Sequence, residues 1–189
     1  MGTESGAAEQ TGWQEPPPAR IERRLVREAQ HGSGEALAAL YSAHWRRAHR
    51  AAYLVVHDAA AAEDIAQDAF LAAVDSLDRF DRRRPFAPWL HRIVVNRAID
   101  WVRRESLRRT AADPASEPDP APRAEPLGED LMGALAKLPP EQRAVVVLRH
   151  LLEYTPGEIA RMLELPRGTV NSRLRRALDR LRVLIEVEG

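Results

Sequence analysis

The chain of 189 residues is long enough for one or two small domains and short for a large α/β enzyme. With 44% hydrophobic and 30% charged residues the composition is that of a globular protein, and no apolar run is long enough for a membrane span or a signal peptide. We therefore expect a cytoplasmic protein, and the lack of cysteine excludes disulfides, cysteine-ligated zinc and thiol catalysis.

The formal net charge is zero, but the charges are segregated along the chain. Residues 1–20 and 111–130 carry net charges of −2 and −5, whereas 21–110 and 131–189 carry +4 and +3. Two basic blocks are consistent with nucleic-acid binding, although arginine-rich helix surfaces are also common in soluble proteins. Charge by itself therefore leaves both interpretations open.

Two segments are predicted to lie outside packed domains. Residues 1–19 form a glycine- and proline-bearing tail that we expect to be disordered. Residues 110–128 hold five of the 14 prolines and predict a flexible Pro/Ala/acidic linker. The linker separates two small helical domains, 20–109 and 129–189, in an all-α fold.

In the first domain apolar residues recur at helical spacing. Ser33 and Asp58 are predicted N-caps for the helices that follow them. The proline-interrupted segment 80–88 predicts a loop, and a further helix is expected from about Trp89 to Arg104.

The second domain carries sharper signals. Pro139 and Pro140 precede a helix, and Thr155 with Glu158 predicts a capping box that opens a short helix. A turn at 164–166 then leads into a last helix over 167–187. A short helix, a tight turn and a basic second helix are typical of a helix-turn-helix. The predicted inward face of the last helix consists of Val170, Leu174, Leu178, Leu181 and Ile185.

The last helix is also strongly basic, with six arginines against one acid between residues 167 and 182. Its first turns carry Thr169, Asn171 and Ser172, short polar side chains that can reach phosphates or base edges in the major groove. The alternative is a solvated basic face, but the helix-turn-helix pattern and the charge together favour DNA contact.

Aromatic and basic residues are interleaved in the loop and helix of the first domain. Phe80, Phe86 and Trp89 are predicted to stack on unpaired bases, and Asn96 to hydrogen-bond the edge of a flipped-out base. Alternatively, Phe86 and Trp89 are core residues that close the loop. The interleaved arginines are Arg79, Arg82, Arg83, Arg84 and Arg92.

Motifs in both halves resemble the extracytoplasmic-function sigma factors of bacterial RNA polymerase. Residues 62–71 (AEDIAQDAFL), Arg79-Phe80 and 84–93 (RPFAPWLHRI), with Asn96 and Asp100, are similar to the second conserved region of that family. The segments 138–143 (LPPEQR), 158–160 (EIA) and 165–174 (LPRGTVNSRL) are similar to its fourth region. The order and the intervening linker also agree with the family.

The resemblance implies a dissociable subunit that joins core RNA polymerase, directs it to promoters and promotes melting of the −10 element. Its implied partners are the clamp helices of the largest polymerase subunit, the flap of the second-largest subunit, and promoter DNA as duplex and as melted single strand. An anti-sigma factor is the expected regulator. The resemblance implies neither enzymatic activity nor a cofactor or metal, and no insertion into the membrane.

Residue roles follow from the resemblance position by position. The implied polymerase-binding residues are Glu63, Asp64, Gln67, Asp68, Phe70 and Leu71. Those implied for the −10 element are Phe80, Arg82, Arg84, Phe86, Trp89, Arg92, Ile93, Asn96, Arg103 and Arg104. Those implied for the −35 element are Arg167, Thr169, Asn171, Ser172, Arg173, Arg175 and Arg176.

Two alternative functions explain the sequence less well. A stand-alone dimeric helix-turn-helix regulator would explain the second domain, but neither the aromatic and arginine loop nor the acidic helix around Glu63 and Asp68. An enzyme would need a catalytic constellation, and the histidines show no metal-binding or catalytic spacing. These histidines are His31, His44, His49, His57, His91 and His150.

Overall fold

The structure, a computed structural model, describes residues 17–111 and 129–188, and every regular element in these ranges is helical. The all-α prediction is confirmed. Except for a few residues at their edges, the predicted tail and linker lie outside the described residues. The elements are α1 (Ala19–Gln30), α2 (Gly34–Val56), α3 (Ala59–Asp75), the 3-10 turn η1 (Leu77–Arg79), α4 (Phe86–Ala111), α5 (Glu129–Ala136), α6 (Pro140–Val146), the π-helical turn η2 (Val147–Leu151), α7 (Pro156–Met162) and α8 (Arg167–Glu188).

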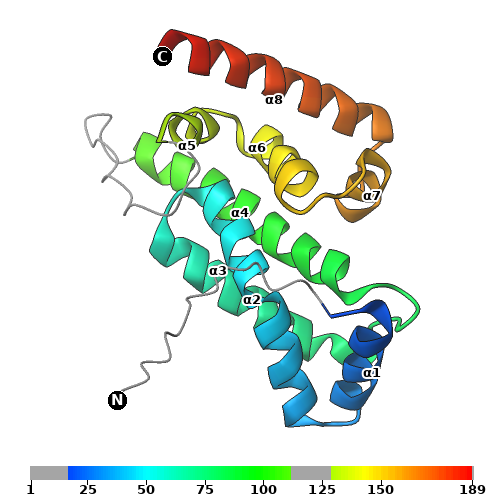
Figure 1. Cartoon of the computed structure of the whole chain (residues 1–189). Coiled ribbons are helices and arrows are strands. Elements are labelled where there is room, and N and C mark those ends of the chain that lie inside the picture. The colour runs from blue at the N-terminus through cyan, green and yellow to red at the C-terminus, as the bar shows by residue number, and fades with distance from the viewer. Residues whose placement is uncertain (1–16, 112–128, 189) are drawn as a thin grey trace, which may run out of the picture.

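Helices α1 to α4 form a bundle around α2, which packs against each of the other three (Figure 1). Both predicted caps are confirmed, because Ser33 accepts a hydrogen bond from Ala36 N (3.2 Å) and Asp58 from Ala61 N (2.8 Å). The chain leaves α2 at His57, whose φ of 58° lies in the left-handed region. Local signals thus set the limits of α2 and α3.

Helix α4 begins at Phe86 rather than at Trp89 and extends to Ala111 rather than to Arg104. Pro88 therefore falls in the first turn, where a missing N–H leaves no helical hydrogen bond unmade. The buried Glu22 of α1 anchors this start, because its Oε1 accepts a hydrogen bond from Phe86 N at 2.5 Å. The loop before α4 is accordingly shorter than predicted.

The C-terminal helices confirm the helix-turn-helix. The capping box is complete: Glu158 N donates to Thr155 Oγ1 (3.3 Å), and Thr155 N donates to Glu158 Oε2 (2.8 Å). The turn between α7 and α8 contains Glu164 in the left-handed region, with a φ of 54°. This turn sets α8 against α7, as a recognition helix requires.

The inward face of α8 differs in part from the prediction. Leu178 and Ile185 were expected inside but are 44% and 40% exposed. The buried positions follow steps of four, three and four residues, the repeat of a single helix face, and Leu178 lies one residue beyond it. The buried residues are Val170, Leu174, Ala177 and Leu181.

The two groups of helices pack against each other, with α6 between α8 and the N-terminal bundle (Figure 1). Helix α4 contacts α6 and α7, while α2 contacts α5, α6 and η2. The buried hydrophobic side chains of both groups belong to one continuous cluster. The buried Arg143 of α6 links them further, since its guanidinium donates to the carbonyl of Val55 near the end of α2.

Candidate nucleic-acid interface

Three aromatic rings meet where the loop joins α4. The ring centroid of Phe80 lies 4.5 Å from that of Trp89, and Phe86 lies 5.6 Å from Trp89 and 5.9 Å from Phe80. Phe80 and Phe86 are only 7% and 4% exposed, and Trp89 is half-buried. In this conformation the rings pack against one another in edge-to-face and tilted contacts, so the alternative loop-closing role of Phe86 and Trp89 accounts for their packing, and it extends to Phe80.

Beyond the rings, a single face of α4 carries several of the predicted −10 residues. Trp89, Arg92, Asn96 and Arg103 recur at steps of three, four and seven residues, which places them along one side of the helix. Asn96 is exposed, and Arg92 and its neighbour Ile93 are half-buried. The structure thus brings polar and basic side chains together beside the aromatic cluster.

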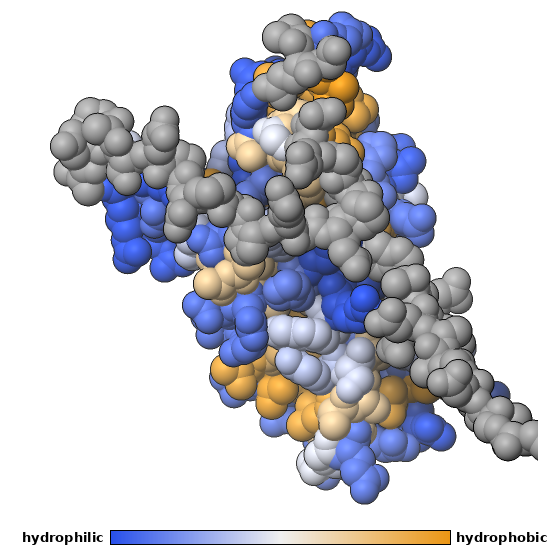
Figure 2. Space-filling view, turned by 60° about the vertical axis from the view of Figure 1, so that its left-hand side comes forward, coloured by the Kyte–Doolittle hydropathy of each residue, from blue (hydrophilic) through white to orange (hydrophobic). Residues whose placement is uncertain are grey.

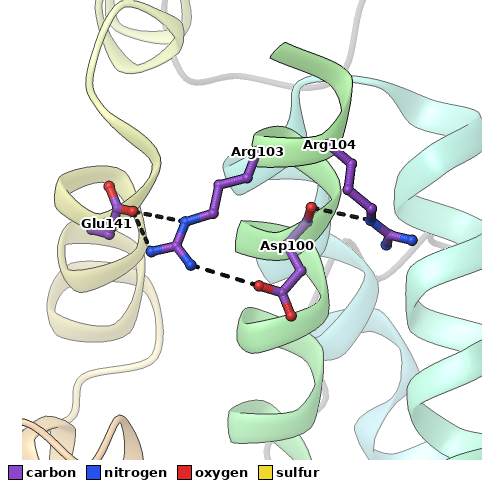
Figure 3. A network of polar contacts seen from close by, with 4 residues as sticks. All are labelled: Asp100, Arg103, Arg104 and Glu141. Carbon is purple, nitrogen blue, oxygen red and sulfur yellow. Dashed lines mark hydrogen bonds and ion pairs between the residues drawn. The ribbon is translucent and has the colours of Figure 1, made fainter. Parts of the chain in front are cut away.

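Arg104 belongs to a different side of α4. Its Nε donates to the carbonyl of Asp100 on the same helix (3.2 Å), while Arg103 turns toward α6 and contacts Glu141 (Figure 3). The predicted −10 residues at the end of α4 therefore do not all share a surface.

The loop before α4 presents Arg82 and Arg84 to solvent. Asp81 folds this loop, because its Oδ1 accepts from Arg83 N (3.0 Å) and its carbonyl accepts from Arg84 N (2.9 Å). The loop arginines are exposed next to the aromatic cluster, at the N-terminal end of the α4 face.

Helix α8 presents the predicted −35 residues. Ser172 Oγ donates to the carbonyl of Thr169 at 2.9 Å, and both side chains are half-buried, as is Arg173. Val170 and Leu174 pack inward, so the remaining predicted side chains point away from the core. The exposed members are Arg167, Asn171, Arg175 and Arg176.

The predicted polymerase-binding helix, α3, borders an apolar groove with a volume of about 370 Å³ between α2 and α3. Leu71 is 63% exposed at this groove, whereas Phe70 is buried beneath it. Tyr41 and Val74, at 40% and 45% exposure, also line it. Figure 2 brings the left side of Figure 1 forward, and hydrophobic side chains reach that surface among hydrophilic ones. The polar side chains of α3 that are predicted to bind polymerase are all exposed, and they are Glu63, Asp64, Gln67 and Asp68.

Two buried histidines lie beneath these surfaces and are held neutral. Burial, with the charge of Arg47, lowers the pKa of His44 to about 4, and burial lowers the pKa of His91 to about 3. His44 Nε2 lies 3.8 Å from Glu22, and His91 Nδ1 lies 2.7 Å from the Tyr154 hydroxyl. Their packing is that of core residues.

Residues 17–111 and 129–188 contain neither a candidate metal cluster nor a candidate membrane span. Over these ranges no three His, Asp or Glu side chains come together in a way that could hold a metal ion. None of the helices described there is long and apolar enough to cross a membrane.

A helical bundle followed by a basic helix-turn-helix indicates a DNA-binding protein, and family models identify both parts. Residues 40–108 match "Sigma-70 region 2" and residues 128–181 match "Sigma-70, region 4". The solved structure of CnrH in complex with the cytosolic domain of CnrY is similar, with a TM-score of 0.68 and 29% identity over 89% of this chain and 99% of that one. RpoE from Bartonella quintana, solved with the anti-sigma factor NepR, has the same fold at a TM-score of 0.65 and 23% identity, over 79% of this chain and 96% of that one.

Curated relatives narrow the family. The ECF RNA polymerase sigma factor SigM of Mycobacterium tuberculosis is 37% identical over 162 residues, covering 83% of this chain and 82% of that protein. SigW of Bacillus subtilis (strain 168) is 28% identical over 177 residues, covering 85% and 94%. The chain belongs to the ECF sigma factors of RNA polymerase. It is an alternative sigma factor, which binds core polymerase and directs it to promoters, and a stand-alone regulator would leave the region 2 match unexplained.

Proposed function

We propose that the two domains divide promoter recognition between them. Residues 20–109 bind core polymerase and capture the −10 element, and residues 129–189 read the −35 element as duplex. The matches to sigma-70 regions 2 and 4, in this order along the chain, support the division.

The observation that carries this proposal is the shared face of α4 beside the aromatic cluster. Arg92 and Asn96 offer donors for phosphates and base edges, and a flipped base would stack on the rings of Phe80 and Trp89, which lie beside them. A base would have to displace part of the ring packing to enter. The complete −10 set is Phe80, Arg82, Arg84, Phe86, Trp89, Arg92, Ile93, Asn96, Arg103 and Arg104.

Polymerase docks on α3 and the groove beside it. An apolar groove with carboxylates along its rim suits a helical partner with apolar and basic side chains, the chemistry we assign to the clamp helices of the largest subunit. The residues are Glu63, Asp64, Gln67, Asp68, Phe70 and Leu71. The C-terminal domain would contact the flap of the second-largest subunit.

Helix α8 reads the −35 element in the major groove. Its exposed arginines would hold phosphates and its short polar side chains would reach base edges. The proposed residues are Arg167, Thr169, Asn171, Ser172, Arg173, Arg175 and Arg176.

This sigma factor makes no chemical bonds and works in the cytoplasm, where its polymerase is. Melting draws on the capture of a flipped base and on polymerase contacts, so neither a cofactor nor a metal is required.

An anti-sigma factor regulates the chain. Support comes from the structural neighbours, which were solved as complexes, RpoE with the anti-sigma factor NepR among them. Purification from the native host under inducing and non-inducing conditions tests this; recovery of polymerase subunits only, in both conditions, would contradict it.

The experiment that tests the DNA assignments compares the two asparagines of the chain. The promoter is first defined by single-round transcription from a randomised library with purified core polymerase. Asn96→Ala should then reduce permanganate-reactive thymines in the −10 region, while Asn171→Ala should weaken binding of the −35 duplex and leave binding of the single-stranded −10 element unchanged. Wild-type melting by Asn96→Ala would refute the −10 assignment.

A further inference from the structure

Two ion pairs join the N-terminal bundle to the C-terminal helices. Arg92 Nη2 lies 2.5 Å from Glu164 Oε1 in the turn of the helix-turn-helix. Arg103 donates twice to Glu141 Oε1 at the start of α6, from Nη2 at 2.6 Å and from Nε at 3.0 Å (Figure 3). Both arginines come from the α4 face described above.

The partners of these arginines have the chemistry of the proposed ligand. A guanidinium binds carboxylate and phosphate oxygens through the same planar array of donors. Glu141 and Glu164 therefore occupy, in this conformation, donors that would otherwise be available to the DNA backbone.

Glu141 also interacts electrostatically with Arg173, which belongs to the proposed −35 surface. Burial would raise the pKa of Glu141, but the hydrogen bond from Arg103 and the charges of Arg103 and Arg173 outweigh it, so the pKa lies below its usual value. A single carboxylate thus lies in the field of an arginine proposed for the −10 element and of one proposed for the −35 element.

We propose that Glu141 and Glu164 form an internal anion latch: they hold the C-terminal helices over α4 in place of DNA phosphates and keep the free chain from binding the −10 strand. The inference rests on the proposed role of Arg92 and Arg103 in promoter binding. The latch acts in addition to any anti-sigma factor, because it needs no second protein.

The exposure of the pairs makes the latch reversible. The Arg92 and Glu164 side chains are 39% and 70% exposed, and those of Arg103 and Glu141 are 56% and 27% exposed. Partly exposed pairs are individually weak and are screened by salt. A nucleic-acid strand that offers several phosphates, or a polymerase that holds the two domains apart, displaces them.

The first test measures binding of the full-length chain to a fluorescent single-stranded oligodeoxythymidylate of about 20 nucleotides, which exceeds the footprint of one binding domain. The variant is Glu141→Gln/Glu164→Gln, and the charge-matched control is Glu35→Gln/Glu186→Gln, two exposed positions on α2 and α8. Two lost pairs predict about tenfold tighter binding by the latch variant than by the control. Equal binding by the two variants would overturn the latch.

A second readout follows the two domains without DNA. Because the chain has no cysteine, Ser42→Cys on α2 and Arg161→Cys on α7 can be labelled specifically with a donor and acceptor dye. The latch predicts that energy transfer in the wild type moves with rising salt toward the value of the latch variant. Salt-independent transfer that is identical in both proteins would contradict it.

A third variant separates the latch from the promoter assignment. Adding Arg92→Gln/Arg103→Gln to the latch variant should abolish the gain in oligonucleotide affinity, and a gain that persists would overturn the proposal. Arg92→Gln/Arg103→Gln on its own, assayed in holoenzyme by permanganate, tests the promoter role separately: intact melting would refute that role, whatever the dye pair reports.

Discussion

Arg143 shows how a single buried side chain can join two domains. It is 6% exposed, and its guanidinium donates to the carbonyls of Val55, Ala136 (2.6 Å) and Leu138 (2.9 Å). Burial lowers the pKa of Arg143 to about 10, which leaves it charged at neutral pH. The Val55 carbonyl is one that α2 leaves without a helical partner at its C-terminal end, where a cation is favoured.

Arg143→Met should therefore lower the free energy of unfolding by about 3 kcal/mol, since it leaves buried carbonyls without donors. Urea denaturation measures the change. Arg161→Met, at an exposed position on α7, is the control and should change stability by less than about 0.5 kcal/mol. Equal effects of the two substitutions would mean that the carbonyl network adds nothing to stability.

The buried His44 makes stability depend on pH. Its folded pKa of about 4 lies below the ordinary value of 6.5, so the unfolded chain binds a proton first as pH falls. Stability is fully present above pH 6.5 and is lost between that value and about pH 4. The Glu22 pKa, raised by burial despite backbone hydrogen bonds from Phe86 and Ala87, gives a slope of opposite sign just above its ordinary value of 4.5.

The lowered pKa of His44 predicts that the free energy of unfolding falls by about 2 kcal/mol between pH 7 and pH 5. His44→Leu should remove this share of the dependence and leave the share of His57 and His91, whose pKa values burial also lowers. His31→Gln, at an exposed histidine, should keep the full wild-type dependence. Unfolding by urea at both pH values gives the comparison. A wild-type slope in His44→Leu would assign the dependence to other groups.

At the scale of the elements, α7 is the shorter helix of the helix-turn-helix, and its stability depends on its N-terminal cap. Thr155→Ala removes the side-chain acceptor of the capping box and should cost about 1 kcal/mol of unfolding free energy. Because α7 supports α8, binding of duplex −35 DNA should weaken as well. Thermal unfolding and duplex titration test both effects. Thr110→Ala, near the exposed end of α4, is the control and should affect neither.

The elements show where prediction from sequence succeeds. The caps at Ser33, Asp58 and Thr155 and the start of α8 at Arg167 agree with the sequence, because a cap joins residues three positions apart. The start of α4 was predicted too late, because Glu22 on another helix anchors it. The roles of individual residues in polymerase and DNA binding stay predictions. The spacing of apolar residues in the sequence did not predict that Phe80 is buried.

At the scale of the whole molecule, the continuous hydrophobic cluster and Arg143 couple the two domains. We expect the chain to unfold in one transition. Of the four tryptophans, Trp45, Trp89 and Trp101 lie in the N-terminal bundle, Trp13 lies outside the described residues, and residues 129–189 contain none. Tryptophan fluorescence therefore reports on the bundle, and far-ultraviolet circular dichroism on both domains. Coincident urea midpoints are expected, and two separate midpoints would show that the domains unfold independently.

The sequence by itself determined most of the helices, three of their caps, the helix-turn-helix and the family, because periodicity, capping and motifs depend on residues close together in the chain. It did not predict α5 or the limits of α4. Only the tertiary structure decided which faces meet. Arg92 pairs with Glu164, 72 residues away in the sequence, and Arg103 pairs with Glu141, 38 residues away. No local pattern encodes such pairs, since they depend on how the shapes of two folded domains fit together.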